Sequence, residues 1–365
     1  MPLGWPGGIA CPSFTTCYAV GSNGLESSGV SHIHVTTNAG GTWTTQNTPP
    51  DHVSGLACPS TTACYAVGYT SNYGPFVLVG APAPVRPGCS SSGVASASFA
   101  GGYWLAGANG AVYSCGDAPF YGSLASLHIT PRAPVVGIAS TPDHLGYWLV
   151  ASDGGLFAFG DAHFYGSMGG KHLNKPIVGI AATPDGGYYE VASDGGIFAF
   201  GPGAVFHGSM GGKHLNKPIV AIAATTDGGY YEVASDGGIF AFGPGTPFHG
   251  SMGGRHLNEP VVGMATTPDG GYYEVASDGG VFSFGAPFHG STGCLRLNRP
   301  IVGMVDSTSS TTSGTGAACG VRSPQAPGGY QFVASDGGVF SFGNAVFAGS
   351  LGGQGVTDVV GIANS

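Results

Sequence analysis

Short apolar runs alternate with turn residues along most of the chain. Within residues 176–209 the runs are PIVGIAAT, GYYEVAS, GIFAFG and AVFHGS, and they are separated by PDG, SDGG and GPG. Aspartate and glycine accept the positive φ angles that tight hairpins need, so these breaks predict antiparallel hairpins. The runs carry apolar residues at both odd and even positions, which is typical of strands covered on both faces.

This unit repeats along the chain. Successive turn positions are separated by 44, 41, 42, 42 and 58 residues, and the last interval contains an insertion at about 305–328 that includes DSTSSTTSGTG. Four short strands in about 42 residues predict one blade of a β-propeller. The turn residues that mark the repeat are Asn109, Asp153, Asp194, Asp236, Asp278 and Asp336.

The repeat predicts an all-β fold, with one β-propeller of four-stranded antiparallel blades over residues 1–365. Residues 1–92 form divergent blades that contain cysteines, residues 93–357 form six SDGG-type blades, and residues 358–365 supply a closing strand. We expect this last strand to pair with N-terminal material and close the ring. The count is eight blades, or seven if the first 50 residues and the last strand share a blade. Opening strands are expected near Gly8, Ser54, Val94, Val135, Ile177, Ile219, Val261 and Ile301.

The units that follow Gly102 resemble propeller-like repeats of secreted actinobacterial proteins. The resemblance is carried by the pattern GYW.VASDGGIF.FG, followed by F.GS. In those proteins the repeats often accompany cell-wall hydrolases or other exported domains. The resemblance implies an extracellular binding or scaffold module, and it implies no particular reaction.

A second motif lies nearer the N-terminus. The segment TTNAGGTWTTQ, Thr36–Gln46, resembles the Asp-box of sialidase-like and photosystem assembly factor-like propellers. Gly40, Thr42 and Trp43 match the motif, whereas threonine and asparagine stand in place of its serine and aspartate. The Asp-box is a structural turn in its families, so the resemblance supports the fold and carries no catalysis.

Composition excludes several classes of function. The chain has 69 glycines and 26 prolines, which argues against long helices. Its net charge of -9 includes no basic run, so nucleic acid is not expected as a partner. No apolar stretch approaches the roughly 18 residues of a membrane span. The start MPLGWPGG lacks the layout of a signal peptide, so either a signal was removed or the protein is not exported.

The eight cysteines favour disulfides over a metal site. CPSFTTCYAVG and CPSTTACYAVG place two cysteines on either side of a short turn, and no cysteine pair has a histidine at zinc-ligand spacing. Disulfides form in oxidising compartments, so we expect a secreted, extracellular or cell-surface protein. The expected pairs are Cys11–Cys17, Cys58–Cys64, Cys89–Cys115 and Cys294–Cys319.

One end of the predicted blades repeats a polar loop. Loops after the second and fourth strands of a blade share an end, so SDGG and the segment within FHGSMGGKHLNKPIV lie together. The SDGG aspartates are explained as turn residues, but a turn requires neither the cation nor the histidine of the other loop. The candidate ligand-binding residues are therefore Lys171, His172, Asn174, Lys213, His214, Asn216, Arg255, His256 and Asn258.

A second pattern links glutamate with histidine. Three units have a glutamate in the second strand, and those units alone have a histidine in the fourth. A contact that satisfies a buried carboxylate explains the pattern, and so does recent duplication of one blade. A ring of metal or ligand sites is the third explanation. The pairs are Glu190 with His207, Glu232 with His249, and Glu274 with His289.

These observations favour a protein without catalytic activity and without a cofactor. The six arginines are scattered, unlike the arginine cluster of sialidases, and no G-x-S-x-G or H-E-x-x-H motif occurs. The leading hypothesis is a secreted, lectin-like module that binds repetitive extracellular glycan or cell-wall polymer through several weak copies of one loop. The alternative is a structural or assembly protein that contacts other protein chains. A polysaccharide lyase or hydrolase is the third possibility, because propeller lyases use histidine and tyrosine.

Overall fold

The computed structural model is an all-β protein that divides into two compact units. The units are Met1–Arg86 with Val94–Ala97, and Pro87–Gly93 with Ser98–Ser365. No helix in the described part of the chain is long and apolar enough to cross a membrane. The structure describes strands at 6–10, 17–22, 31–36, 44–45, 52–60, 63–69, 75–80 and 89–90, and it describes residues 101–307 and 328–365 throughout.

The first unit contains two antiparallel sheets among its described strands. The Asp-box-like segment begins at the end of one strand, Thr36, and contains the next, Thr44–Thr45, while its residues 37–43 lie outside the described part. The two sheets are β1 (Pro6–Ala10), β2 (Cys17–Ser22), β3 (Ser31–Thr36), β4 (Thr44–Thr45), and β5 (His52–Ser60), β6 (Ala63–Tyr69), β7 (Pro75–Gly80).

The second unit contains six antiparallel sheets, five of which have three strands. The first sheet joins β26 (Val359–Asn364), β9 (Gly102–Gly107), β10 (Val112–Gly116) and β8 (Cys89–Ser90). The others are β11 (Val135–Ser140), β12 (Gly146–Ala151), β13 (Leu156–Gly160); β14 (Ile177–Ala182), β15 (Tyr188–Ala192), β16 (Ile197–Phe200); β17 (Ile219–Ala224), β18 (Tyr230–Ala234), β19 (Ile239–Phe242); β20 (Val261–Thr266), β21 (Tyr272–Ala276), β22 (Val281–Phe284); and β23 (Ile301–Ser307), β24 (Gly329–Ala334), β25 (Val339–Gly343).

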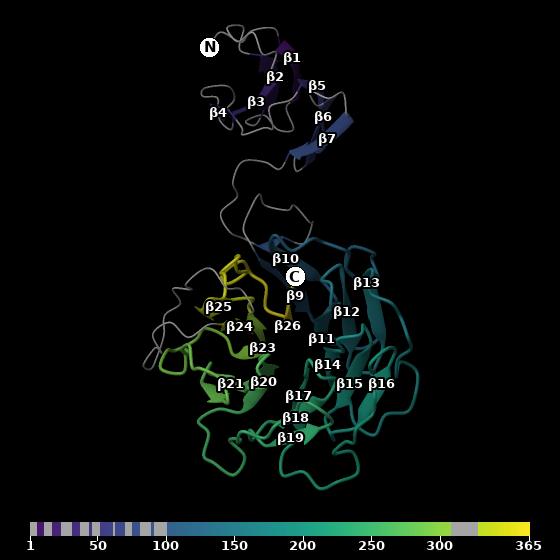
Figure 1. The fold of residues 1–365 in the computed structure, drawn as a ribbon, viewed down its shortest axis with the longest axis vertical. Coiled ribbons are helices and arrows are strands. Elements are labelled where there is room, and N and C mark those ends of the chain that lie inside the picture. Colours follow the sequence, from purple (N-terminus) through teal and green to yellow (C-terminus); the bar gives the residue numbers. More distant parts are fainter. Residues whose placement is uncertain are drawn as a thin grey trace. The chain divides into compact units, whose positions relative to one another are not determined.

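The six sheets have the radial arrangement of a β-propeller. The first strand of each sheet lies nearest the middle of the unit and the third strand lies outside (Figure 1). First strands contact one another in the order β26, β11, β14, β17, β20, β23, and β23 contacts β26. Each sheet packs against the next through apolar side chains, so the middle strands are buried on both faces, as Tyr188 and Val191 of β15 show.

The prediction of four strands in each blade was wrong for the five three-stranded sheets of the second unit. The segment AVFHGS that follows β16 pairs with no strand and lies against the following sheet. There the buried Tyr230 of β18 donates a hydrogen bond to the carbonyl of Gly208, at 2.6 Å, and accepts one from the amide of His207, at 3.1 Å. The tyrosine hydroxyl therefore takes the place of a strand partner.

The same tyrosine clamp recurs at every sheet of the second unit. In each case the hydroxyl donates to the carbonyl of the glycine in the preceding F-x-G-S segment. One of these clamps joins the last segment of the chain, at Gly349, to Tyr103 of the first sheet. The six tyrosines are Tyr103, Tyr147, Tyr188, Tyr230, Tyr272 and Tyr330.

The partner predicted for the C-terminal strand was wrong. Strand β26 pairs with β9, with Ile362 opposite Leu105, and with none of β1–β7. Its sequence VVGIA matches the opening strands of the other sheets, so it takes the first position in the sheet of β9. The opening strand expected near Val94 lies outside the described residues. The eight described sheets are thus two in the first unit and six in the second, where a single ring of eight blades was expected.

The SDGG turns are fixed by their own chemistry. The Asp194 carboxylate accepts a hydrogen bond from the amide of Gly196, at 3.1 Å. Gly195 has a φ of 77°, and a Cβ atom there would lie 2.5 Å from the Cβ atom of Met210. Only glycine fits this position, and the aspartate serves the turn.

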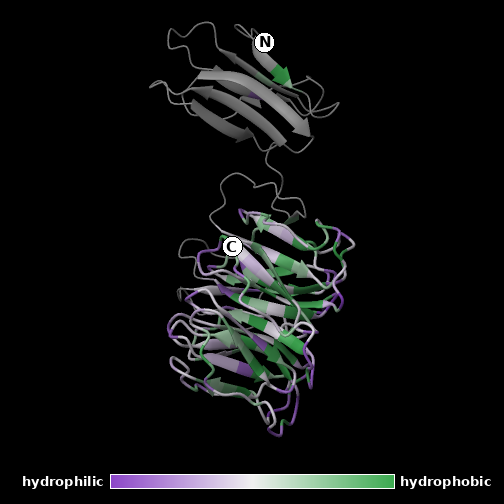
Figure 2. Ribbon diagram, turned by 90° about the vertical axis from the view of Figure 1, so that its right-hand side faces the viewer, coloured by the Kyte–Doolittle hydropathy of each residue, from purple (hydrophilic) through white to green (hydrophobic). Residues whose placement is uncertain are grey.

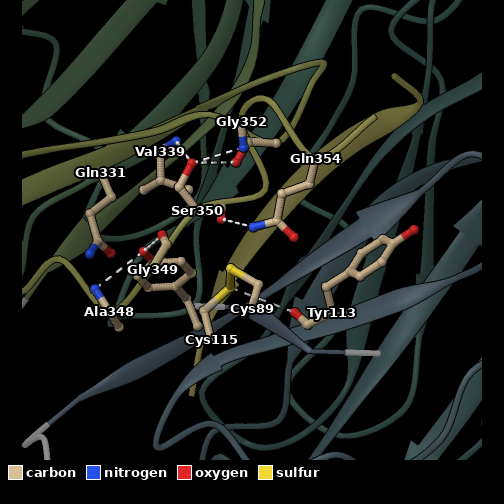
Figure 3. The surroundings of a disulfide bond; sticks show 12 residues. Cys89, Tyr113, Cys115, Gln331, Val339, Ala348, Gly349, Ser350, Gly352 and Gln354 are labelled. Atoms are coloured by element: carbon tan, nitrogen blue, oxygen red, sulfur yellow. Dashed lines mark hydrogen bonds between the residues drawn. A yellow bond between two sulfur atoms is a disulfide. The ribbon is translucent and has the colours of Figure 1, made fainter. Parts of the chain in front are cut away.

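One predicted disulfide is confirmed within the second unit (Figure 3). Cys89 of β8 lies opposite Cys115 of β10, with the Cα atoms 4.1 Å apart. Cys294 is also disulfide-bonded, but its expected partner, Cys319, lies outside the described residues. The expected pairs Cys11–Cys17 and Cys58–Cys64 involve residues whose side chains are outside the described part as well.

Candidate functional site

The SDGG turns and the polar connecting segments lie at the same end of the sheets, which we term the loop end. It comprises the SDGG turns and the segments 168–176, 210–218 and 252–260, together with their counterparts in the other sheets. The amide of Ser193, in one turn, donates to the carbonyl of Pro176, at 2.9 Å, and Ser235 does the same to Pro218. The nine candidate residues Lys171, His172, Asn174, Lys213, His214, Asn216, Arg255, His256 and Asn258 are all exposed here.

Two of the candidate cations reach across to the next sheet. The ammonium nitrogen of Lys171 lies 5.8 Å from the centre of the Phe200 ring, and that of Lys213 lies 5.8 Å from the Phe242 ring. At this distance the positive charge is attracted by the ring face. These two lysines therefore stabilise the boundary between sheets in addition to facing solvent.

Three glutamates are buried in the same boundaries. Glu190, Glu232 and Glu274 lie on β15, β18 and β21 with no exposed surface, and their carboxyl oxygens make no hydrogen bond of standard geometry, although a backbone amide of the preceding segment lies near each. Burial raises the pKa of each to about 8, because ionisation is unfavourable away from water. The carboxyls are consequently protonated at neutral pH.

The lysines of the loop end act on these carboxyls through space. Burial is the largest influence on the pKa of Glu232, and the amide of Met210 and the charge of Lys213 lower it, while Asp194 raises it. Lys171 acts in the same sense on Glu190. Each glutamate thus faces the connecting segment that precedes its own sheet.

The predicted glutamate–histidine pairs are not joined by hydrogen bonds. His207 and His249 are exposed, and their rings lie 6.1 Å from those of Tyr230 and Tyr272. His289 is buried, and its ring lies 5.5 Å from that of Tyr330. Within the described residues, no group of three histidine, cysteine, aspartate or glutamate side chains is placed to hold a metal ion.

A different pairing, which the sequence interpretation missed, follows the sheet boundaries. Where the connecting segment has a basic residue, the middle strand of the next sheet has a glutamate. Where the same position of the segment is uncharged, the middle strand has leucine or phenylalanine instead. The signal is in the sequence, but reading it requires knowing that each segment packs against the following sheet. The pairs are Lys171 with Glu190, Lys213 with Glu232, Arg255 with Glu274, Leu127 with Leu149, Leu295 with Phe332, and Gln354 with Leu105.

A groove opens at the loop end beside the first sheet. It has a volume of about 590 Å³ and lies between the turn at Asn109 and the segment that leads to β11. Exposed His128 and Arg132 line it together with Ile129. His128 has a φ of 56°, in the left-handed region that non-glycine residues rarely adopt. Sequence interpretation did not single out these residues, since neither the histidine nor the arginine belongs to the repeated KHLN pattern.

Comparison with known proteins gives a distant likeness. No protein-family model and no curated protein matches the chain. One similar solved structure is "YCF48 bound to D1 peptide", with a TM-score of 0.30 and 12% identity over 78% of this chain and 79% of that one. Another is YCF48 from Cyanidioschyzon merolae, with a TM-score of 0.35 and 13% identity over 78% of this chain and 96% of that one.

Proposed function

We propose that the chain is a non-catalytic scaffold protein whose second unit contacts other protein chains. The observation that carries this proposal is a set of exposed phenylalanines in the segments that cross from one sheet to the next. Phe164, Phe206, Phe248 and Phe347 are 55%, 58%, 63% and 45% exposed. The equivalent position is phenylalanine in all six units, although only the half-buried Phe120 and Phe288 pack on the core. Aromatic side chains are enriched in the cores of protein interfaces.

The scaffold is a six-bladed closed ring. Three features support this geometry: the cyclic order of contacts between first strands, the pairing of β26 with β9, and the clamp from Tyr103 to Gly349. Together they join the end of the second unit to its beginning, so the unit has no free sheet edge at its inner strands. Such a ring holds repeated surface groups at fixed spacing, which favours multivalent contact.

The protein is proposed to act outside the cell or at its surface. The Cys89–Cys115 disulfide supports this location, because disulfides persist in oxidising compartments.

Photo-crosslinking tests the scaffold function. A benzoyl-phenylalanine at position 206 should form covalent adducts with other protein chains in native material, and an unirradiated sample of the same variant serves as the control. If position 206 yields no protein adducts, the proposed contact surface is wrong.

Glycan binding at the loop end is the second candidate function. It is favoured by the groove beside Asn109 and by the three exposed copies of the Lys/Arg-His-x-Asn loop. Concave sites with a few polar groups are the usual form of small-ligand sites. Binding to a glycan panel or to cell walls, and its loss when Lys171, Lys213 and Arg255 all become alanine, would support it. If correctly folded protein binds no glycan of the panel and no cell wall, glycan binding is excluded.

A further inference from the structure

Basic side chains are concentrated at one end of the second unit. The sequence has ten lysines and arginines, and the eight in the described residues all lie in the connecting segments of the loop end. Each is exposed. They are Arg132, Lys171, Lys175, Lys213, Lys217, Arg255, Arg296 and Arg299.

The opposite end carries acidic side chains and, among the described residues, no lysine or arginine. We term it the hairpin end, and it comprises the turns that join first to second strands at 141–146, 183–187, 225–229 and 267–271. Each turn exposes one aspartate, and Figure 2 shows hydrophilic residues gathered in the turns and connecting segments at the margins of the sheets. The four aspartates are Asp143, Asp185, Asp227 and Asp269.

The two sets of charges are built on the same strands. Lys175 precedes β14 and Asp185 follows it, and Lys217 and Asp227 flank β17 in the same way. Arg132 and Asp143 flank β11. Neighbouring first strands are in contact, so the basic row and the acidic row follow the same order of strands.

The complementarity has local exceptions. Glu259 precedes β20 and Asp358 precedes β26, so two of the six first strands are preceded by an acidic residue. The SDGG aspartates also lie at the loop end, but they are half-buried and accept hydrogen bonds from their own turns. The basic row is therefore continuous along β11, β14 and β17 at the loop end. The acidic row is continuous along the same three strands at the hairpin end.

From this match in sign and strand order we infer that a second copy of the chain docks its loop end on the hairpin end of the first. This inference rests on the proposed scaffold function and adds a second contact surface, whose partner is another copy of the chain. The contact is heterologous, joining two different surfaces, so it continues from copy to copy unless something terminates the stack. Single exposed ion pairs are weak, but a row of them acts together and is screened by salt.

Sedimentation velocity of the full chain at low and high salt gives the first test. We expect species larger than the monomer at 20 mM NaCl, growing with protein concentration, and their loss at 500 mM NaCl. A wild-type protein that stays monomeric at high concentration and low salt overturns the inference.

Charge reversal gives the second test. The variant with Asp185→Lys and Asp227→Lys should be monomeric, and so should the variant with Lys175→Glu and Lys217→Glu. An equimolar mixture should associate again, because each then offers an end that complements the other. Circular dichroism and the melting temperature show whether the variants fold, which their exposed positions favour.

The outcomes separate this inference from the proposed function. Variants that associate as well as wild type, or a mixture that stays monomeric, overturn head-to-tail stacking. If crosslinks from position 206 to other proteins persist in such a case, the scaffold function stands and only the stacking of copies is wrong. If those crosslinks also fail, both proposals fall.

Discussion

Replacing Glu232 by leucine should remove a pH-dependent loss of stability. The carboxyl has a pKa of about 8 in the folded chain, against 4.5 for a free side chain, because it is buried. Between these values the unfolded chain ionises and the folded chain does not, so rising pH favours unfolding by about 1.4 kcal/mol per pH unit. The part of the free energy of unfolding that depends on Glu232 is thus fully present below pH 4.5, and it is lost as the pH rises through 8. By pH 7 the loss is about 3 kcal/mol.

Leucine suits the site because Leu105 and Leu149 occupy the same position in two other sheets, where they are fully buried. Urea unfolding from pH 4.5 to 8.5 measures the effect. Near pH 5 the free energy of unfolding of the Glu232→Leu variant should equal or exceed that of the wild type. The difference in favour of the variant should grow steadily toward pH 8. Glu232→Gln, which cannot ionise, should lose the same part of the pH dependence.

The matched control is Glu259→Leu, at an exposed glutamate of the loop end. It should leave the pH dependence of unfolding unchanged. The reasoning fails if the Glu232→Leu variant keeps the wild-type slope of free energy against pH, or if it weakens relative to wild type as pH rises.

Three further changes test the packing of the second unit. Tyr230→Phe removes a buried hydroxyl with two hydrogen bonds and should lower the free energy of unfolding by about 1–3 kcal/mol, whereas Tyr165→Phe, at an exposed tyrosine, should change it little; equal effects would contradict the clamp. Gly237→Ala should destabilise much more than Gly254→Ala in thermal melts, since both have positive φ but only the former would place Cβ 2.5 Å from another side chain; similar melting temperatures would refute this. Cys115→Ser should lower stability by about 2–4 kcal/mol, and a reductant that fails to lower the melting temperature of the wild type would count against a structural role.

Local chemistry allowed much of the fold to be read from the sequence. Strands begin at Val135, Ile177 and Ile219, where the repeat predicted them, because proline and turn residues mark the starts. The SDGG turns were likewise predictable, since aspartate and glycine specify them. The fourth segment was not, because AVFHGS has the pattern of a strand while its backbone partner is Tyr230, in the following sheet.

The candidate site was predicted only in part. The loop residues near Lys213 were expected at one end of the sheets, and they lie exposed there. The surroundings of Glu232 were not foreseen, because its neighbour Lys213 belongs to a different sheet boundary from the one the glutamate–histidine pattern suggested. The position of the fourth segment and the surroundings of Glu232 both depend on the packing of each connecting segment on the next sheet. This packing joins residues far apart in the sequence, so no local pattern encodes it.

Zero-length crosslinking of a mixture of ¹⁴N- and ¹⁵N-labelled full chains most directly tests whether the protein is a scaffold built from its own copies. Lys217 and Asp227 lie on either side of the six-residue strand β17, which alone spans roughly 17 Å, so a zero-length reagent cannot join them within one molecule. The account predicts crosslinked peptides that combine Lys175 or Lys217 of one label with Asp185 or Asp227 of the other, and their disappearance at 500 mM NaCl. Mixed-label peptides that never include these residues, in protein shown to react elsewhere, would contradict it.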